Sequence, residues 1–162
     1  MQPKNYSIYC AGKFITTNQV LDVHNPFNQS LVATTYLADK FVLEEAIIKA
    51  LSVKHQLQDL SPQKKHNILK QISNEIYANR KKLAEILSLE SAKPLKYTMA
   101  EIERSAYTFQ IAADESKKDR TEHLVLERIL QTDKRNGIVE YFPVGLIAGI
   151  APFNFPMNLA VH

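Results

Sequence analysis

Pro143-Val-Gly-Leu-Ile-Ala-Gly-Ile-Ala-Pro-Phe-Asn-Phe-Pro156 is the stretch of this chain that decides its fold. Residues 144–151 are continuously apolar, as is typical of a strand buried on both faces of a parallel sheet. Pro152 and Pro156 each fix their own φ and push the preceding residue into an extended conformation. The sequence therefore predicts a buried strand that runs into a rigid turn carrying Asn154, followed by a helix that begins at Pro156.

Asn154 occupies a position in this turn that is suited to chemistry. Open α/β sheets bind ligands just past the carboxyl ends of their strands, and the amino end of a helix favours negative charge. An amide held there can donate a hydrogen bond to a developing oxyanion, and loss of such a donor typically costs about 100- to 1000-fold in rate. The alternative that Asn154 only caps the following helix stays open on spacing alone.

The composition is that of one globular domain of ordinary size. The 162 residues are 45% apolar and 23% charged, with a net charge of +3. Both signs are mixed along the chain, so we expect no nucleic-acid partner. No apolar run approaches the about 18 residues of a membrane span, and the start lacks the apolar core of a secretory signal. A single cysteine, Cys10, excludes an intramolecular disulfide, so we expect a cytoplasmic protein without a membrane partner.

Short strands are expected before the helices. Residues 6–37 hold apolar and β-branched runs that are broken at Ala11-Gly12-Lys13 and at Asn25-Pro26, which are turn signals. Residues 124–130 and 137–142 alternate like an antiparallel pair of strands.

Three helices are expected between these two β regions. Asp39 is a plausible N-cap for the first. Ser61-Pro62 begins a long second helix that ends at Pro94, and the third runs to about Ser116. The apolar stripes recur at three- and four-residue steps: Ile68, Leu69, Ile72, Ile76, Leu83, Ile86 and Leu87 in the second helix, and Met99, Ile102, Ala106, Phe109 and Ala113 in the third.

The first parallel strand comes late in this chain. Such a strand needs neighbours, each reached by a crossover of a dozen or more residues, and no such crossover follows residue 151. We therefore expect a truncated α/β fold. In it, residues 144–151 should be exposed to solvent or rest on the helices without parallel partners.

A resemblance becomes specific at the same stretch. Pro143-Val-Gly, followed by Ile150-Ala-Pro-Phe-Asn-Phe-Pro156, resembles the signature that opens the cofactor-binding domain of the aldehyde dehydrogenase superfamily. Matches occur in the same order at Gly12-Lys13, Asn25-Pro26, Glu90-Ser-Ala-Lys-Pro94 and Ala100-Glu-Ile102. The family usually has glycine where this chain has Ala92, which puts a positive φ at that position in doubt. The match covers about the first third of a family member.

The resemblance implies an α/β fold class, in which this chain is mainly a helical layer with small strands and the doubly wound parallel sheet is only begun. Residues 1–122 would hold the amino-terminal strands and the three-helix part of the cofactor-binding domain. Residues 123–142 would supply strands of an oligomerisation sheet, and residues 143–162 the first strand and helix start of the Rossmann-like sheet. The full-length parent would be a homodimer or homotetramer.

The resemblance also implies an activity, the oxidation of an aldehyde to a carboxylic acid with NAD or NADP as cofactor. Asn154 would donate its amide to the oxyanion of a cysteine thiohemiacetal, and the backbone of Ile150, Ala151, Pro152 and Phe153 would lie against the nicotinamide ribose. Hydride transfer to the cofactor and hydrolysis of a thioester, with a glutamate as base, complete the reaction. The family's catalytic cysteine and glutamate lie downstream, so we expect this chain alone to be inactive.

A substrate class is implied by Phe153-Asn-Phe-Pro-Met-Asn-Leu159, which is similar to the branch with lactaldehyde dehydrogenases and non-phosphorylating glyceraldehyde-3-phosphate dehydrogenases. In that branch, the arginine matching Arg104 contacts the anionic end of the substrate, and the residue matching Phe155 lines the pocket. The alternative for Arg104 is a solvent-facing side chain paired with Glu101 or Glu103.

Other interpretations of the chain are weaker or remain open. Cys10 has no local histidine partner, and His162 is expected to be a helix residue without metal-ligand spacing around it, so we expect no metal site. Gly145 and Gly149 do not form Gly-x-Gly-x-x-Gly, which disfavours a different Rossmann enzyme. A non-enzymatic truncated product, or an interaction module that docks through the helices of residues 39–116, remains an alternative.

Overall fold

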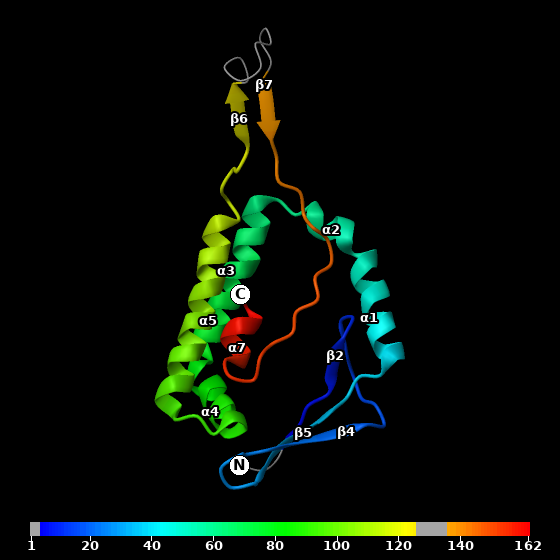
Figure 1. Cartoon of the computed structure of the whole chain (residues 1–162), viewed down its shortest axis with the longest axis vertical. Coiled ribbons are helices and arrows are strands. Elements are labelled where there is room, and N and C mark those ends of the chain that lie inside the picture. Colours follow the sequence, from blue (N-terminus) through cyan, green and yellow to red (C-terminus); the bar gives the residue numbers. More distant parts are fainter. Residues whose placement is uncertain (1–3, 126–135) are drawn as a thin grey trace.

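The computed structural model describes residues 4–125 and 136–162 (Figure 1). Small strands come first, a helical layer follows, and a hairpin and a short last helix complete the chain. The elements are β1 (Lys4–Asn5), β2 (Ile8–Cys10), β3 (Lys13–Ile15), β4 (Val20–His24), β5 (Leu31–Tyr36), α1 (Lys40–Ser52), α2 (Lys54–Gln58), α3 (Pro62–Ala78), α4 (Arg80–Ser91), α5 (Leu95–Glu115), β6 (Glu122–Val125), β7 (Asn136–Val139) and α7 (Pro156–Ala160). This mainly helical arrangement with small sheets confirms the predicted fold class.

The amino-terminal strands form at the predicted turns. β2 and β3 pair as an antiparallel hairpin, with positive φ at Ala11 (51°) and Gly12 (84°). Positive φ at both central residues is the signature of the hairpin turns whose twist matches that of the flanking strands. β4 and β5 form a second antiparallel pair, to which β1 adds in parallel beside β5. The Asn25 side chain accepts a hydrogen bond from the Phe27 amide at 2.9 Å and so closes the second turn.

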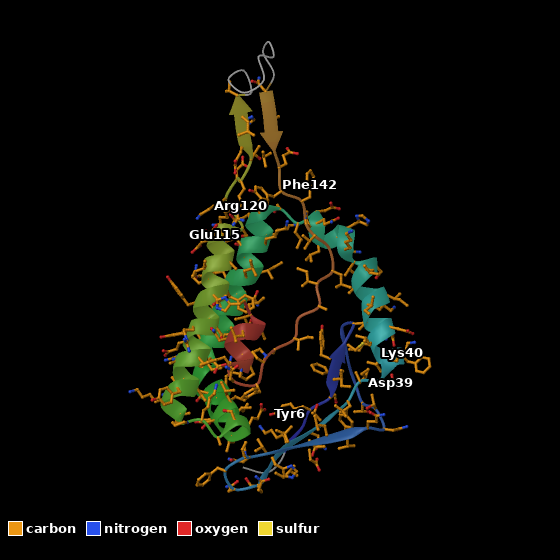
Figure 2. All side chains as sticks on the ribbon, in the orientation of Figure 1. Tyr6, Asp39, Lys40, Glu115, Arg120 and Phe142 are labelled. Carbon is orange, nitrogen blue, oxygen red and sulfur yellow. The ribbon has the colours of Figure 1, made fainter. Side chains whose placement is uncertain are left out.

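Two helix starts are confirmed atom by atom. The Asp39 carboxylate accepts a hydrogen bond from the Val42 amide at 2.9 Å and caps α1 (Figure 2). The Ser61 hydroxyl accepts one from the Lys64 amide at 3.3 Å, and Pro62 is the first residue of α3. Both caps satisfy backbone donors that have no partner within the helix itself.

The single long helix predicted between Ser61 and Pro94 is wrong. α3 ends at Ala78 and α4 begins at Arg80, because Asn79 leaves the helical conformation at φ −93° and ψ 8°. Its backbone and side-chain amides both donate to the carbonyl of Glu75, at 3.1 and 2.9 Å. Short amide side chains compete with helix hydrogen bonds in this way. The break lets α3 and α4 each pack on α5.

α4 ends on a residue in the left-handed conformation. Ala92 has φ 54° and ψ 18°, so the positive φ that was in doubt is present although the residue is not glycine. The Ser88 hydroxyl donates to the Lys93 carbonyl at 2.6 Å and the Ser91 hydroxyl accepts from the Lys93 amide at 3.4 Å. These bonds fix the chain reversal between α4 and α5, and with it the position of Lys93.

The core lies between α3, α4 and α5; in Figure 1, α3 and α5 run side by side and the shorter α4 lies at one end of this pair. Side chains of both predicted stripes form it. The buried members are Ile76, Ala84, Leu87, Ile102 and Ala106, with Ile72, Leu83, Met99, Phe109 and Met157 packed against them. Met157 belongs to α7, so the last helix is anchored on this core. In contrast, α1 and α2 bury none of their residues.

Residues 144–151 form no strand, which corrects the predicted strand at this position. They run as an irregular segment between β7 and α7, drawn in orange and red in Figure 1. Val144 and Ile150 are 86% and 97% exposed. Gly145, Leu146 and Ile147 line a cavity of about 540 Å³ against α1, α2 and α3. The expectation of an exposed segment without parallel partners is confirmed, because a strand needs a neighbouring edge to pair with.

The predicted hairpin near the end of α5 forms, but β7 ends at Val139, so residues 140–142 of the second predicted strand are not strand. Glu122 pairs with Val139 and Leu124 with Gly137 in antiparallel register, whereas residues 126–130 of the predicted strand lie outside the described ranges. Glu115 ends α5, where hydrogen bonds from Lys118 and Arg120 hold the pKa of its carboxyl below the ordinary value (Figure 2). The oligomerisation role of the hairpin and the division into three regions stay predictions.

Within residues 4–125 and 136–162, no helix is long and apolar enough to cross a membrane.

Candidate active site

The turn that carries Asn154 is followed by α7, and Pro156 is its first residue, as predicted. Phe155 occupies the N-cap position and offers no capping side chain. The alternative that Asn154 caps the helix is therefore wrong. Asn154 is exposed, and its side-chain amide makes no hydrogen bond to any residue that the structure describes. The amide is thus open to a ligand.

Glu101 of α5 caps α7 from outside the helix. Its carboxylate is 1% exposed. Oε1 accepts hydrogen bonds from the backbone amides of Met157 at 3.1 Å and Asn158 at 3.3 Å. A carboxylate at the amino end of a helix satisfies orphan donors and complements the helix dipole. The short helix is therefore held by an acidic side chain that comes from more than 50 residues earlier in the chain.

Lys93 holds the same turn at Asn154 itself. Its ammonium lies 3.1 Å from Glu101 Oε2, and it also donates a hydrogen bond to the backbone carbonyl of Asn154. The same nitrogen lies 4.4 Å from the centre of the Phe155 ring, within the range of a cation–π contact. Lys93 thus contacts the buried carboxylate, the Asn154 backbone and the neighbouring aromatic side chain.

Arg104 lies on α5, about one helical turn after Glu101, and its side chain is exposed. Its guanidinium carbon is 5.7 Å from the centre of the Phe155 ring, so the structure brings these two predicted substrate residues together. The alternative pairing of Arg104 with Glu101 or Glu103 is not found. Glu101 pairs with Lys93 instead, and Glu103 lies 4.0 Å from Arg80. Arg104 is therefore available to an anion beside Phe155.

Residues 14–162 match the aldehyde dehydrogenase family. This chain belongs to the aldehyde dehydrogenase family. The match includes the Asn154 turn and all of the helical layer, and it confirms the resemblance seen in the sequence.

Two curated aldehyde dehydrogenases illustrate the match. The lactaldehyde dehydrogenase of Methanocaldococcus jannaschii is 33% identical over 155 residues, which are 96% of this chain and 32% of the relative. The 3-sulfolactaldehyde dehydrogenase of Priestia megaterium is 32% identical over 162 residues, which are 99% of this chain and 33% of the relative. The chain therefore spans about a third of the length of the curated relatives that it matches.

Solved aldehyde dehydrogenases share the fold. Aldehyde dehydrogenase 21 from Physcomitrella patens, in complex with the reaction product succinate, is 30% identical with a TM-score of 0.92, over 99% of this chain and 34% of that one. The glyceraldehyde-3-phosphate dehydrogenase GapN of M. jannaschii, complexed with NADP, is 33% identical with a TM-score of 0.81, over 90% and 31%. The fold of this chain thus matches about a third of each of these dehydrogenases.

The segment before Asn154, residues 150–153, is exposed to solvent. Ile150 is 97% and Phe153 is 92% exposed. The backbone groups of residues 150–153 make no hydrogen bond to other described residues. The backbone carbonyls of this segment and its N–H groups, which Pro152 lacks, are thus available to a ligand.

The remaining candidate residues are placed away from this chemistry. Cys10 is buried on β2, and its thiol lies 3.8 Å from the Val42 carbonyl of α1. His162 lies beyond α7, which ends at Ala160, so the prediction that it is a helix residue is wrong. Its Nε2 lies 3.5 Å from the Thr108 hydroxyl. Among the described residues, no three metal-binding side chains are grouped as a site.

Lys93 and Glu101 are the site residues that sequence reasoning missed. One signal was present: Glu101 lies next to Ile102 on a face of α5 that also carries Thr98 and Ser105, all of them buried. A glutamate is almost never fully buried without a partner. Its partners, however, lie at residues 93, 157 and 158, and only the folded chain brings them together.

Proposed function

We propose that this chain is the part of an NAD(P)+-dependent aldehyde dehydrogenase that supplies the oxyanion donor, Asn154. The observation that carries the proposal is the exposed Asn154 amide on a turn fixed by Lys93 and Glu101, in a chain of this family. The reaction is the oxidation of an aldehyde to a carboxylic acid. The whole enzyme is proposed to be a homodimer or homotetramer.

Asn154 acts where negative charge develops. When a cysteine thiolate attacks the aldehyde, the carbonyl oxygen becomes an oxyanion, and the Nδ2 group of Asn154 donates to it. A fixed donor aimed at that oxygen stabilises the transition state by about 3–4 kcal/mol, which corresponds to about 100- to 1000-fold in rate. Residues 150–153 hold the nicotinamide ribose through their open backbone groups. The cofactor supplies the hydride acceptor when it is bound.

Arg104 and Phe155 form one wall of the substrate site. The guanidinium beside the Phe155 ring is exposed and suits a carboxylate, sulfonate or phosphate. The names of three relatives support this choice, since 3-sulfolactaldehyde, glyceraldehyde-3-phosphate and the product succinate each carry an anionic group, whereas lactaldehyde, named for another relative, is an uncharged hydroxyaldehyde. We therefore propose a small aldehyde with an anionic end as the substrate.

These 162 residues are proposed to be inactive by themselves. Their single cysteine, Cys10, is buried against α1 and lies on a different element from the Asn154 turn. A buried thiol that donates to a backbone carbonyl is not an activated nucleophile. The nucleophile and the base are therefore expected from the part of the family fold that this sequence does not cover.

A second candidate function, an interaction module, is favoured by one observation. α1 and α2 bury none of their residues, and Phe41 and Ile48 of α1 are 80% and 65% exposed. Faces of this kind mark protein contacts. In the proposed enzyme, the same face is covered by the rest of the family fold.

A chimera tests the proposed enzyme function. This chain replaces the matching first third of the P. megaterium 3-sulfolactaldehyde dehydrogenase, and reduction of NAD+ and of NADP+ is followed with 3-sulfolactaldehyde. Asn154→Ala is expected to lower kcat about 100- to 1000-fold. Asn67→Ala, which removes an exposed amide from α3, is expected to leave kcat unchanged. An active chimera that keeps its kcat after Asn154→Ala would refute the proposed role.

The isolated 162-residue chain is assayed in parallel with the same aldehyde and both cofactors. We expect no turnover. Ordinary enzymatic turnover by the purified chain would show that the missing nucleophile is not needed, and the proposed division of labour would be wrong.

A further inference from the structure

Two charged side chains that the proposed reaction does not use hold the Asn154 turn from Asn154 onward. Lys93 donates to the carbonyl of Asn154 itself. Glu101 accepts from the amides of Met157 and Asn158, which follow the turn. The two side chains are joined by an ion pair of 3.1 Å between Lys93 Nζ and Glu101 Oε2. The backbone at Asn154 and just after it is therefore tied to one charge pair, in which Glu101 is buried and Lys93 is half-buried.

We propose that Lys93 and Glu101 are positioning residues that aim the Asn154 amide at the oxyanion. The inference rests on the proposed function of Asn154. It adds that the direction of the amide is set by residues from another part of the chain, since the Asn154 side chain makes no hydrogen bond to a described residue that would orient it. Lys93 and Glu101 touch neither the substrate nor the reacting atoms in this proposal.

Directed bonds are needed here because the turn has little else to orient it. α7 has five residues and no capping side chain of its own. The preceding residues 150–153 are exposed. Apolar packing of Met157 is non-directional, so it anchors the helix without setting the rotation of the turn. Charge-assisted hydrogen bonds are short and directional. These hydrogen bonds fix the carbonyl of Asn154 and the amides of Met157 and Asn158, which are the first free amides of α7.

The position of Lys93 is itself built into the fold. Ala92 is in the left-handed conformation, and Ser88 and Ser91 bond to the Lys93 backbone. The Lys93 side chain is 24% exposed and Glu101 is 1% exposed, so water competes little for their contact. A buried charge pair is weak evidence for a gain in stability. Its geometry, however, is well suited to holding one backbone conformation.

The expected catalytic effect follows from how steeply rate depends on position. A misplacement of about 1 Å by a mutation away from the chemistry can cost about 100-fold in rate. Lys93→Met keeps the alkyl stem and removes the charge. Glu101→Gln keeps the shape and the oxygen that accepts from both helix amides, but it removes the negative charge and the oxygen that pairs with Lys93. Each variant should let the turn rotate while the core of α3, α4 and α5 remains.

Hydrogen exchange on the 162-residue chain tests the clamp without any assay of activity. Glu101→Met, which removes both acceptor oxygens, is expected to speed exchange of the Met157 and Asn158 amides at least about 10-fold relative to the Ala106 amide in the α5 core. Glu103→Met, two residues along α5, is the matched control and should leave both amides unchanged. Unchanged exchange at Met157 and Asn158 in Glu101→Met would overturn the proposal.

The chimera then tests whether the clamp acts through Asn154. Lys93→Met and Glu101→Gln are each expected to lower kcat at least about 10-fold, with the KM for the cofactor unchanged. In the Asn154→Ala background, neither variant should lower kcat further, because residues that act as one unit are not additive. Losses that add in full to that of Asn154→Ala would mean a merely structural role and would overturn the proposal. If Asn154→Ala alone has no effect, the proposed function fails, whereas the exchange result still decides whether the clamp holds the turn.

Discussion

Replacing Ala92 with glycine should stabilise this chain, although the same change elsewhere in a helix would weaken it. Ala92 has φ 54° and ψ 18° at the end of α4. A left-handed conformation costs an L-residue about 1–2 kcal/mol, and glycine adopts it without that penalty. The greater conformational freedom of glycine in the unfolded chain lowers the free energy of unfolding by about 0.4–1 kcal/mol. The net expectation is a gain of about 0.5–1 kcal/mol in the free energy of unfolding.

Ala100→Gly provides the matched control. Ala100 is exposed and lies inside α5, in the right-handed conformation. There the same substitution should cost about 0.5–1 kcal/mol. The unfolded-state contribution is common to both variants, so it cancels in their difference. That difference should therefore equal the left-handed penalty alone, about 1–2 kcal/mol.

Urea unfolding followed by circular dichroism measures both variants. With a slope of about 2 kcal/mol per molar urea for a chain of this size, the midpoint of Ala92→Gly should rise by about 0.25–0.5 M. The midpoint of Ala100→Gly should fall by a similar amount. If both midpoints fall together, Ala92 is not held in the left-handed conformation, and the account of the α4–α5 reversal is wrong.

Two further predictions concern pH and substrate. Desolvation raises the pKa of Glu90, which borders the cavity between β5 and α4. A raised carboxyl pKa means that folding is favoured while the group is protonated, and this stability is lost as pH rises through the folded-state pKa. Glu90→Gln should therefore raise the Tm at neutral pH but not near pH ~4, and an equal rise at both pH values would contradict the assignment. In the chimera, Arg104→Met should raise the KM for 3-sulfolactaldehyde at least about 10-fold and leave the KM for uncharged propanal unchanged; equal changes for the two aldehydes would show that Arg104 does not read the anionic end.

Features that depend on neighbouring residues were predictable from the sequence. Asp39, Ser61 and Pro156 begin helices where expected, because a cap or a proline acts on backbone within four residues of itself. The apolar stripe of α5 likewise reached the core. The break at Asn79 was missed because the stripe continues across it. Periodicity alone did not reveal that the Asn79 amides both bond to Glu75.

Features that depend on distant partners were not predictable from the sequence. Residues 144–151 have the composition of a buried strand, yet in this structure they pair with nothing described and remain largely exposed. Composition reports what a segment can bury. Whether it becomes a strand depends on a neighbouring edge.

The sequence by itself determined that Asn154 lies on a short turn before a helix, because two prolines restrict the backbone around it. It also determined the family, through the residues that surround the turn. Only the tertiary structure decided what holds that turn. Lys93 and Glu101 lie 61 and 56 residues before their partners Asn154 and Met157, and only the packing of α7 on α5 brings them together. The physical reason is that a buried charge must be paired with hydrogen-bond donors, and the fold can bring these donors from any part of the chain. The spacing of residues in the sequence therefore does not predict which donors they are.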